Sequence, residues 1–313
     1  MAQPKNQFDR KLKFLNSSDD TLLAYAVTIQ NLMWRNIQPI LDLFDDRILP
    51  NDTTVDLIGK LQTEAFRTYR EETYRITDQV KTDFSTINYY TDAYFRNYST
   101  DNPEGFQEGK DYSESLRVEQ LGLASNGLLR DGFLNSYRQN PAVLNVLRVA
   151  TFAAITTGLL KKTLINRLRK AILGDEKTSG VAEVQVNTTL IDTYNNFDSQ
   201  TQKARAQRIG LRVAIYSNTI IQDSRCFCRN KFNKAWTIEE IADFEASTKT
   251  SETRSGAGCK AIYETTLYDP FVHRGGYNCR HVLRYVPRGT AVRFRPDLEE
   301  YYNDLDERGV NYL

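Results

Sequence analysis

The 313-residue chain is poor in cysteine, histidine, tryptophan and methionine, with 4, 2, 2 and 2 residues respectively, and it has no long apolar run. Its longest weakly polar run, Val149 to Leu160, has 12 residues, whereas a bilayer-spanning helix needs about 20. We therefore expect no stable membrane span. The opening residues, Met1 to Phe14, also lack the apolar stretch of a secretory signal. This favours a reducing cytoplasm, where stable disulfides are not the default.

Glycine and proline are also too scarce, at 16 and 8 residues, for a collagen-like or low-complexity chain. Hydrophobic residues make up 40% and charged residues 26%, which is typical of a soluble globular protein and excludes wholesale disorder. The length exceeds that of a usual single domain, so the sequence predicts two or three packed units.

The net charge of +1 conceals two regions of opposite sign. Residues 201–296 contain 17 basic and 8 acidic residues, a net charge of +9, whereas residues 297–313 contain 1 and 6, a net charge of −5. A basic region binds nucleic acid by neutralising phosphates and releasing their counterions. It also complements an acidic protein surface. The composition leaves both partners open: non-specific DNA, or an acidic protein.

Most of the first 215 residues have the apolar spacing of amphipathic helices. Ser17 or Ser18 is an N-cap candidate for a helix whose apolar stripe reaches Ile37. Pro39 is expected to kink or end that helix. A second capping signal at 51–52 precedes another long helical pattern.

Two segments, 100–110 and 175–188, have the composition of loops. Between them, residues 113–173 fit a helical hairpin. Pro141 lies where a helix would start, and Gly174 lies just past the last apolar position.

Residues 190–216 predict one more helix, followed by short segments of mixed character. The predicted fold class is therefore mainly α, with a helical N-terminal two thirds and a small mixed α/β module that contains the cysteines and histidines. Four basic residues of the 190–216 helix are candidate DNA contacts: Lys203, Arg205, Arg208 and Arg212.

All four cysteines and both histidines lie between Cys226 and His281, a window of 56 residues. Independent scattering would produce this with a chance below about one in a thousand, so the clustering indicates a site. Thr237 and Glu240, inside the window, predict a capping box that opens a short helix.

Two sequence blocks bound this window. The first contains Asp223, Arg225, Phe227 and Cys228, and the second contains Gly275, Gly276, Asn278, Cys279, Arg280 and His281. With the Trp236 to Ile241 segment between them, they resemble the C-terminal region of the phage minor head or head-morphogenesis proteins typified by the F protein of phage Mu. The resemblance covers about residues 185–288, and the closing block is its most specific part. Cys226, Cys259 and residues 247–258 depart from the family pattern.

The resemblance implies a structural protein of a tailed phage or prophage rather than an enzyme. Its expected place is inside the head of the virion, after assembly in the host cytoplasm. Its expected partners are the portal and major capsid proteins and, without sequence preference, phage DNA. The motif residues would maintain the module, and none is assigned to catalysis. We expect four regions: a helical region at 1–110, a helical hairpin at 111–184, a head-morphogenesis-like module at 185–290 and an acidic tail at 291–313.

The chemistry of the cysteines and histidines has three interpretations. Structural zinc takes four thiolate or imidazole ligands in a tetrahedron. One such set would be Cys228, Cys279 and His281 with one of Cys226, Cys259 or His273. Alternatively, a Cys228–Cys279 disulfide would close a loop of about 50 residues and stabilise the fold by several kcal/mol. In the third interpretation the thiols are packed and free, and Asp223 forms a structural ion pair with Arg225.

The alternative function is a nucleic-acid-processing enzyme or toxin-like effector that uses the Cys/His site. The sequence offers little for it. The order of His273, Asn278 and His281 does not match the spacing of a histidine-asparagine-histidine nuclease. Residues 256–258 lack the lysine and the setting of a phosphate-binding loop.

Overall fold

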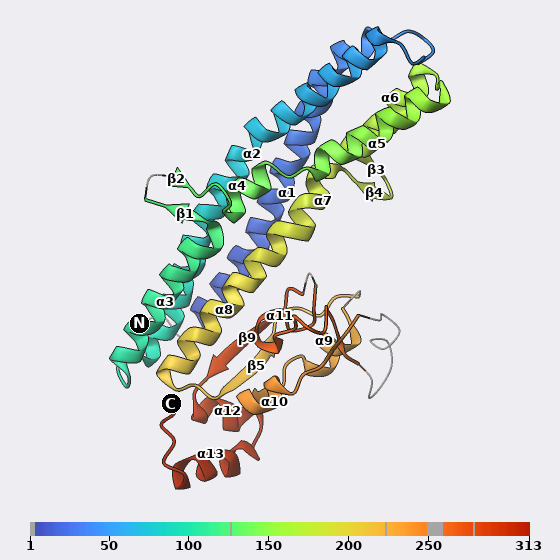
Figure 1. The fold of residues 1–313 in the computed structure, drawn as a ribbon. Helices are drawn as coiled ribbons and strands as arrows, with labels where there is room; N and C mark the ends of the chain where they lie inside the picture. Colours follow the sequence, from blue (N-terminus) through green and yellow to red (C-terminus); the bar gives the residue numbers. More distant parts are fainter. Residues whose placement is uncertain (1–3, 126, 223, 249–258, 278) are drawn as a thin grey trace. The chain divides into compact units, whose positions relative to one another are not determined.

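The computed structural model describes residues 4–125, 127–222, 224–248, 259–277 and 279–313. It is mainly helical with short strands, which confirms the predicted fold class (Figure 1). The chain divides into two compact units. The helical unit comprises residues 17–83 and 119–190, and the mixed unit comprises residues 1–16, 84–118 and 191–313. Each unit takes residues from more than one of the four regions expected from the sequence.

Two long helices, α1 (Pro4–Asp42) and α2 (Asp52–Phe95), contribute residues to both units. The other elements of the helical unit are shorter. They are β1 (Leu123–Ala124), β2 (Gly127–Leu128), α4 (Phe133–Arg138), α5 (Ala142–Thr157), α6 (Lys161–Leu173), β3 (Gly174–Asp175), β4 (Thr178–Ser179), α7 (Val181–Gln185) and the π-helix η2 (Val186–Leu190). The two strand pairs, β1–β2 and β3–β4, are antiparallel.

The helices of this unit are joined by an apolar core and by side-chain hydrogen bonds. Gln62 Nε2 of α2 donates to Thr151 Oγ1 of α5 at 3.0 Å, and Gln30 Nε2 of α1 donates to Glu183 Oε2 of α7 at 2.9 Å. The apolar stripe predicted for α1 is buried: Leu22, Ala26, Ile29, Met33 and Ile37. In the described part of the chain, none of the helices combines the length and the apolar character needed to cross a bilayer.

The predicted start of the first helix was wrong. α1 runs through Ser17 and Ser18, so neither residue caps it. Phe8 and Leu15 are buried and continue the apolar stripe toward the N-terminus at a spacing of seven residues. Pro39 lies inside α1, one turn before its end. A polar dipeptide therefore did not stop a helix whose apolar stripe continued on both sides of it.

Both predicted loops are shorter than expected. Helix α3 spans Pro103–Leu121 and begins inside the 100–110 segment, where Asn102 Oδ1 accepts a hydrogen bond from the Gly105 amide at 2.9 Å. The 175–188 segment contains β4, α7 and part of η2. Three other boundaries are confirmed, because α2 begins at 52, Pro141 is the N-cap of α5, and Gly174 ends α6.

The mixed unit is built around a three-stranded antiparallel sheet. β5 (Val213–Ser217) lies between β6 (Ala235–Thr237) and β9 (Val282–Val286), so that Val213 is paired with both Thr237 and Val286. The other elements are η1 (Arg96–Tyr98), α8 (Ile191–Ile209), α9 (Cys226–Lys231), α10 (Ile238–Ala242), β7 (Ala246–Ser247), β8 (Ala261–Ile262), α11 (Pro270–His273), α12 (Arg288–Phe294) and α13 (Leu298–Glu307).

The two faces of this sheet are covered by different cores. Val213 and Ile215 of β5 pack with residues of α12 and α13, including Leu298. Ala214 and Tyr216 pack into a second core, which also contains Cys228 and Cys279. This alternation follows from the two-residue period of a strand, which turns successive side chains to opposite faces. Tyr216 is thus directed to the core that holds the candidate site.

The predicted end of the 190–216 helix was wrong, because α8 ends at Ile209 and residues 213–217 form β5. Gly210 follows the helix with a φ of +89°, a conformation that favours glycine and ends the helical turn. Trp236 lies in β6 rather than in the following helix. The predicted capping box is confirmed: Thr237 Oγ1 accepts from the Glu240 amide at 3.1 Å, and Glu240 Oε2 accepts from the Thr237 amide at 2.8 Å.

The acidic tail is folded as α13 and is part of the mixed unit. Its apolar residues are buried: Leu298, Tyr302 and Leu305. Arg288 forms ion pairs with Glu299 and with Asp306, the second at 2.9 Å. The negative charge of the tail is therefore partly neutralised by the basic region that precedes it.

Candidate metal centre

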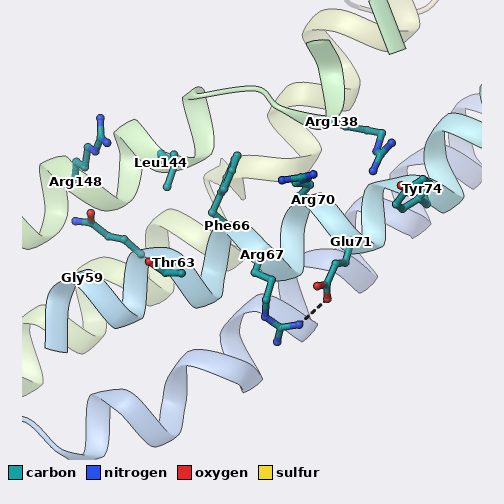
Figure 2. Close-up of a pocket in the computed structure, with 11 residues that line it drawn as sticks. Gly59, Thr63, Phe66, Arg67, Arg70, Glu71, Tyr74, Arg138, Leu144 and Arg148 are labelled. Carbon is teal, nitrogen blue, oxygen red and sulfur yellow. Dashed lines mark hydrogen bonds and ion pairs between the residues drawn. The ribbon is translucent and has the colours of Figure 1, made fainter. Parts of the chain in front are cut away.

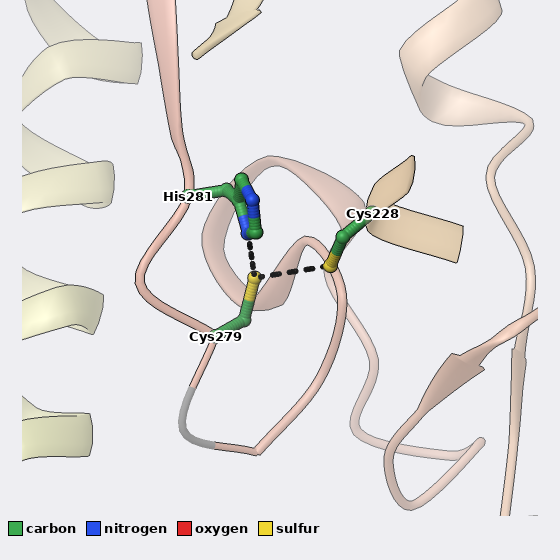
Figure 3. Close-up of side chains that lie close together, drawn as sticks. All are labelled: Cys228, Cys279 and His281. Atoms are coloured by element: carbon green, nitrogen blue, oxygen red, sulfur yellow. Dashed lines mark hydrogen bonds between the residues drawn. The ribbon is translucent and has the colours of Figure 1, made fainter. Parts of the chain in front are cut away.

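Three residues of the predicted site come together in the mixed unit. Cys228 lies in α9. Cys279 and His281 lie directly before β9, and Cys279 is 51 residues after Cys228 in the chain. Their ligand atoms all lie within 4.8 Å of one another. The three side chains point toward a common centre (Figure 3). The trio, as we call these residues below, could hold a metal ion.

The distances within the trio match those of a tetrahedral metal. Cys228 Sγ lies 3.8 Å from Cys279 Sγ, and Cys279 Sγ lies 3.6 Å from His281 Nδ1. For zinc, bonds of about 2.3 Å to sulfur and about 2.0 Å to nitrogen place two tetrahedral sulfurs about 3.8 Å apart and a sulfur and a nitrogen about 3.5 Å apart. The separations of Cys279 Sγ from the other two donor atoms are therefore those of ligands that share one small ion.

The site is enclosed by aromatic and apolar groups. All three trio residues are buried, and the His281 ring stacks on Tyr216 with ring centroids 5.2 Å apart. Tyr216 Oη lies 3.4 Å from Cys228 Sγ and 3.5 Å from Cys279 Sγ. Within the described part of the chain, His281 Nε2 has no hydrogen-bond partner. This nitrogen is not the one that lies near Cys279 Sγ, so a metal bound at Nδ1 would leave Nε2 carrying the proton.

The two thiols differ in acidity because they are neighbours. The hydrogen bond from Cys228 holds the pKa of Cys279 well below the ordinary thiol value, and His281 and the Arg274 charge act in the same direction. The same contact, together with burial, raises the pKa of Cys228. Arg274 is itself buried and donates to the Cys279 carbonyl at 3.4 Å. One sulfur is thus stabilised as the thiolate, which is the form that binds metals.

The glycines of the closing block are required by close packing. A Cβ at Gly275 would lie 2.5 Å from Cys228 Sγ and 3.0 Å from Cys279 Sγ. Gly276 has a φ of +96°, and a Cβ there would collide with the Ile262 carbonyl. At Gly275 the two sulfurs leave no room for a side chain, and at Gly276 the Ile262 backbone leaves none.

Arg225 connects the two sequence blocks. Its guanidinium donates to the Gly275 carbonyl at 2.9 Å and to the Tyr277 carbonyl at 2.6 Å. Phe227, in the same short helix, is buried against the Tyr216 and Phe244 rings. Asp223 and Asn278 lie outside the described residues, so the predicted ion pair between Asp223 and Arg225 is not described.

The three candidates for a fourth ligand have other partners. Cys226 and Cys259 form a disulfide with each other, with Cα atoms 5.5 Å apart. His273 Nδ1 accepts a hydrogen bond from the Asp269 amide at 2.8 Å, and its ring stacks on Tyr263. Cys228 and Cys279 are free thiols, so the disulfide predicted between them does not form in this structure. A bond between Cys226 and Cys259 was not among the predictions, because their separation of 33 residues concealed their proximity.

A cavity of about 410 Å³ opens beside the trio. Besides the trio it is lined by polar residues, among them Asn218, Ser224, Arg225 and Arg280. Every lining residue belongs to the mixed unit. The centre is thus accessible to a small polar ligand as well as enclosed by protein.

The four predicted DNA contacts do not form one exposed surface. Arg205 is buried, with a side chain 1% exposed, and it forms an ion pair with Asp92. The predicted role for Arg205 was therefore wrong, since a guanidinium paired inside the core does not reach a phosphate. Lys203 forms an ion pair with Asp269 at 3.0 Å. Arg208, which lies over the Tyr112 ring, and Arg212 are both partly buried.

Sequence reasoning did not identify Tyr216 and Arg274 as part of the site. Tyr216 could have been found from the continuous apolar run at 213–216, which is consistent with a strand buried on both faces. Arg274 directly precedes the glycine pair, but nothing in its sequence position indicates burial. Comparison of the chain with models of protein families, with curated proteins and with solved structures found no match.

Proposed function

We propose that the chain is a structural minor head protein of a tailed phage or prophage, whose C-terminal module is held together by a zinc ion. The observation that carries this proposal is that the motif residues hold the backbone and the sulfurs of the module in place. Arg225 holds the carbonyls of the closing block, and Gly275 leaves room for the two sulfurs. The residues that resemble the head-morphogenesis family thus join two distant parts of one fold, which is a structural role.

Zinc is the metal favoured by the donor atoms. Two thiolates and an imidazole are soft and borderline ligands, which suit zinc rather than magnesium or calcium. The distances of 3.8 and 3.6 Å agree with its tetrahedral geometry. Bound there, zinc would link α9 to the segment before β9 and add the free energy of metal binding to that of folding.

The proposed partners are the portal and major capsid proteins, inside the head. Exposed apolar residues of the helical unit support a protein partner, because Val149, Phe152 and Leu160 are 71%, 69% and 60% exposed. Val149 and Phe152 lie three residues apart on α5 and therefore on one side of it, and neighbouring exposed apolar groups commonly mark an interaction surface. In this role the protein assists head assembly and, through contacts with DNA, genome packaging or ejection.

Co-expression with the cognate portal protein tests this assignment. We expect a complex on size-exclusion chromatography, and we expect Val149→Ser with Phe152→Ser to weaken it at least tenfold. Val27→Ser, which changes another exposed valine of the helical unit, is the control and should leave the complex intact. If the full-length protein binds neither portal nor immature heads, the head-morphogenesis assignment fails.

A second candidate function is a zinc-dependent enzyme that acts on nucleic acid. The cavity beside the trio favours it, because catalytic zinc has three protein ligands and keeps one position open. Supercoiled plasmid, single-stranded DNA and RNA should be incubated with the zinc-loaded protein. Cleavage that disappears in His281→Ala, with zinc content measured in both proteins, would support the enzyme and contradict the structural role.

A further inference from the structure

A second charged site lies in the helical unit, far from the trio in sequence. A cleft of about 750 Å³ lies between α2 and the segment containing α4 and α5, and all its lining residues belong to the helical unit. Four arginines line it, namely Arg67, Arg70, Arg138 and Arg148, together with a single acidic residue, Glu71 (Figure 2). This cluster of arginines was not predictable from the sequence, because its members are spread over 82 positions.

The one acidic residue of the cleft is already paired. Arg67 Nη1 lies 2.7 Å from Glu71 Oε2, and Arg67 also pairs with Glu64 at 2.6 Å. In Figure 2, Arg67 turns to Glu71, whereas Arg70 points toward the segment that joins α4 and α5. Arg70, Arg138 and Arg148 form no ion pair with any carboxylate in the described part of the chain. The cleft therefore carries three positive charges that the protein itself does not balance.

Arg138 is the unusual member of this group. It is only 9% exposed, its guanidinium carbon lies 3.4 Å over the Tyr74 ring, and its Nε is buried without a hydrogen-bond partner. A buried cation is normally paired with an anion, because desolvation is otherwise uncompensated. Tyr74 fixes the guanidinium plane, so the unpartnered Nε–H group has a defined direction. This is the arrangement expected of a preformed anion site.

We propose that this cleft binds a phosphate-bearing ligand of nucleotide size through Arg70, Arg138 and Arg148. Guanidinium groups hold phosphate oxygens through paired, charge-assisted hydrogen bonds. Phe66 and Leu144 provide an apolar wall for a ring, and Gln62 and Thr63 add hydrogen-bonding groups. The volume lies within the range of small-molecule pockets. A cleft of this size between two helical segments favours one nucleotide, either free or at the end of a strand, over a duplex or an acidic protein surface.

Binding to the full-length protein should be measured by titration calorimetry with pyrophosphate, with adenosine diphosphate and with a ten-residue thymidine oligonucleotide. We expect at least one of these to bind at low salt, and we expect Arg70→Gln and Arg148→Gln each to weaken it about tenfold. These two residues are exposed, so their variants should fold, and circular dichroism should verify this. The oligonucleotide binding more tightly than the diphosphate would identify a strand as the source of the phosphate, and the reverse would identify a free nucleotide.

Arg75→Gln is the matched control. Arg75 is exposed, lies on the same helix and does not line the cleft, so it removes the same charge from a different place. If Arg75→Gln weakens binding as much as Arg70→Gln does, the ligand is attracted by the overall positive charge of the helix and not by the cleft, and the proposal is wrong. Absence of binding by all three probes, or tighter binding of a glutamate-rich peptide than of any of them, would also overturn it.

Discussion

A buried lysine of the mixed unit and a buried arginine of the helical unit differ in how their charge is balanced. In the mixed unit, Lys11 lies 2.7 Å from Asp198, and both side chains are 1% exposed. In the helical unit, Arg138 is also buried but lines a cleft whose one carboxylate, on Glu71, is paired with Arg67. The two units have nearly the same charge balance, with 25 basic and 23 acidic residues in the mixed unit and 16 and 17 in the helical unit. Net charge along a sequence does not reveal which cations are available to a ligand.

The largest expected effect concerns the trio, which only the mixed unit contains. Purified protein should hold about one equivalent of zinc, and Cys279→Ser should lose both the metal and several kcal/mol of stability, because metal binding is coupled to folding. In the variant, amide protection against hydrogen exchange should fall in β5 and β9, whereas α5 and α6 of the helical unit should stay protected. If the purified protein contains no metal, or if removing the metal with a chelator leaves the melting temperature unchanged, the zinc interpretation is wrong.

Breaking the Lys11–Asp198 pair should have the next largest effect. Burial lowers the pKa of Lys11, and the neighbouring Asp198 opposes this shift. Lys11→Met should cost about 3 to 5 kcal/mol, because it leaves a buried carboxylate without its counter-charge. Urea denaturation would measure it. The double variant Lys11→Met with Asp198→Leu should recover a large part of the loss, and failure to do so would mean that packing rather than charge is responsible.

Gly275→Ala tests the close approach of the backbone to the two sulfurs. The new methyl group would lie 2.5 Å from Cys228 Sγ, so we expect a loss of about 1 to 3 kcal/mol and weaker zinc binding. Gly289→Ala is the control, since nothing lies within 4 Å of the position of its added Cβ and it lies in α12. That variant should be neutral or slightly stabilising. Equal losses in the two variants would show that the sulfurs impose no special restriction.

The smallest effect is expected at Arg138, and it completes the comparison with Lys11. Arg138→Met removes a buried cation that has no carboxylate partner, at the cost of its contact with the Tyr74 ring. Removing the buried charge stabilises the fold and losing the contact with the ring destabilises it. The free energy of unfolding, measured by thermal denaturation, should therefore change by less than about 1 kcal/mol. A loss as large as that of Lys11→Met would show that Arg138 is paired within the protein and would remove the basis for an anion site.

Much of the local structure was predictable because it depends on neighbours in the sequence. The buried stripe of α1, the capping box at Thr237 and the end of α6 at Gly174 all follow from residues within two turns of one another. The trio was also among the predicted ligand sets, since the clustering of rare residues exposed it. Its geometry was not predictable, because it depends on how α9 approaches the segment before β9.

The remaining errors share one physical cause, which is that tertiary contacts overrule local signals. Ser17 and Ser18 have the character of caps, but the stripe continues on both sides of them through Leu15 and Leu22. Cys226 pairs with Cys259 rather than joining the trio. Arg205 carries the sequence pattern of a surface cation, yet Asp92 pairs with it in the core. The last two outcomes each depend on a residue more than 30 positions away.

The mixed unit is built from three separate segments of the chain, and this affects the order in which the two units fold during synthesis. Lys11 is 187 positions ahead of its partner Asp198. At 5 to 20 residues per second, synthesis of that interval takes about 9 to 37 seconds. Residues 17–190 contain the whole helical unit, so the sequence of that unit is complete before Lys11 is able to form its ion pair. Tyr94, whose ring packs on Phe8, is made within the interval, whereas the counter-charge of Lys11 comes only at its end, so we expect the Lys11 ammonium to stay hydrated until then.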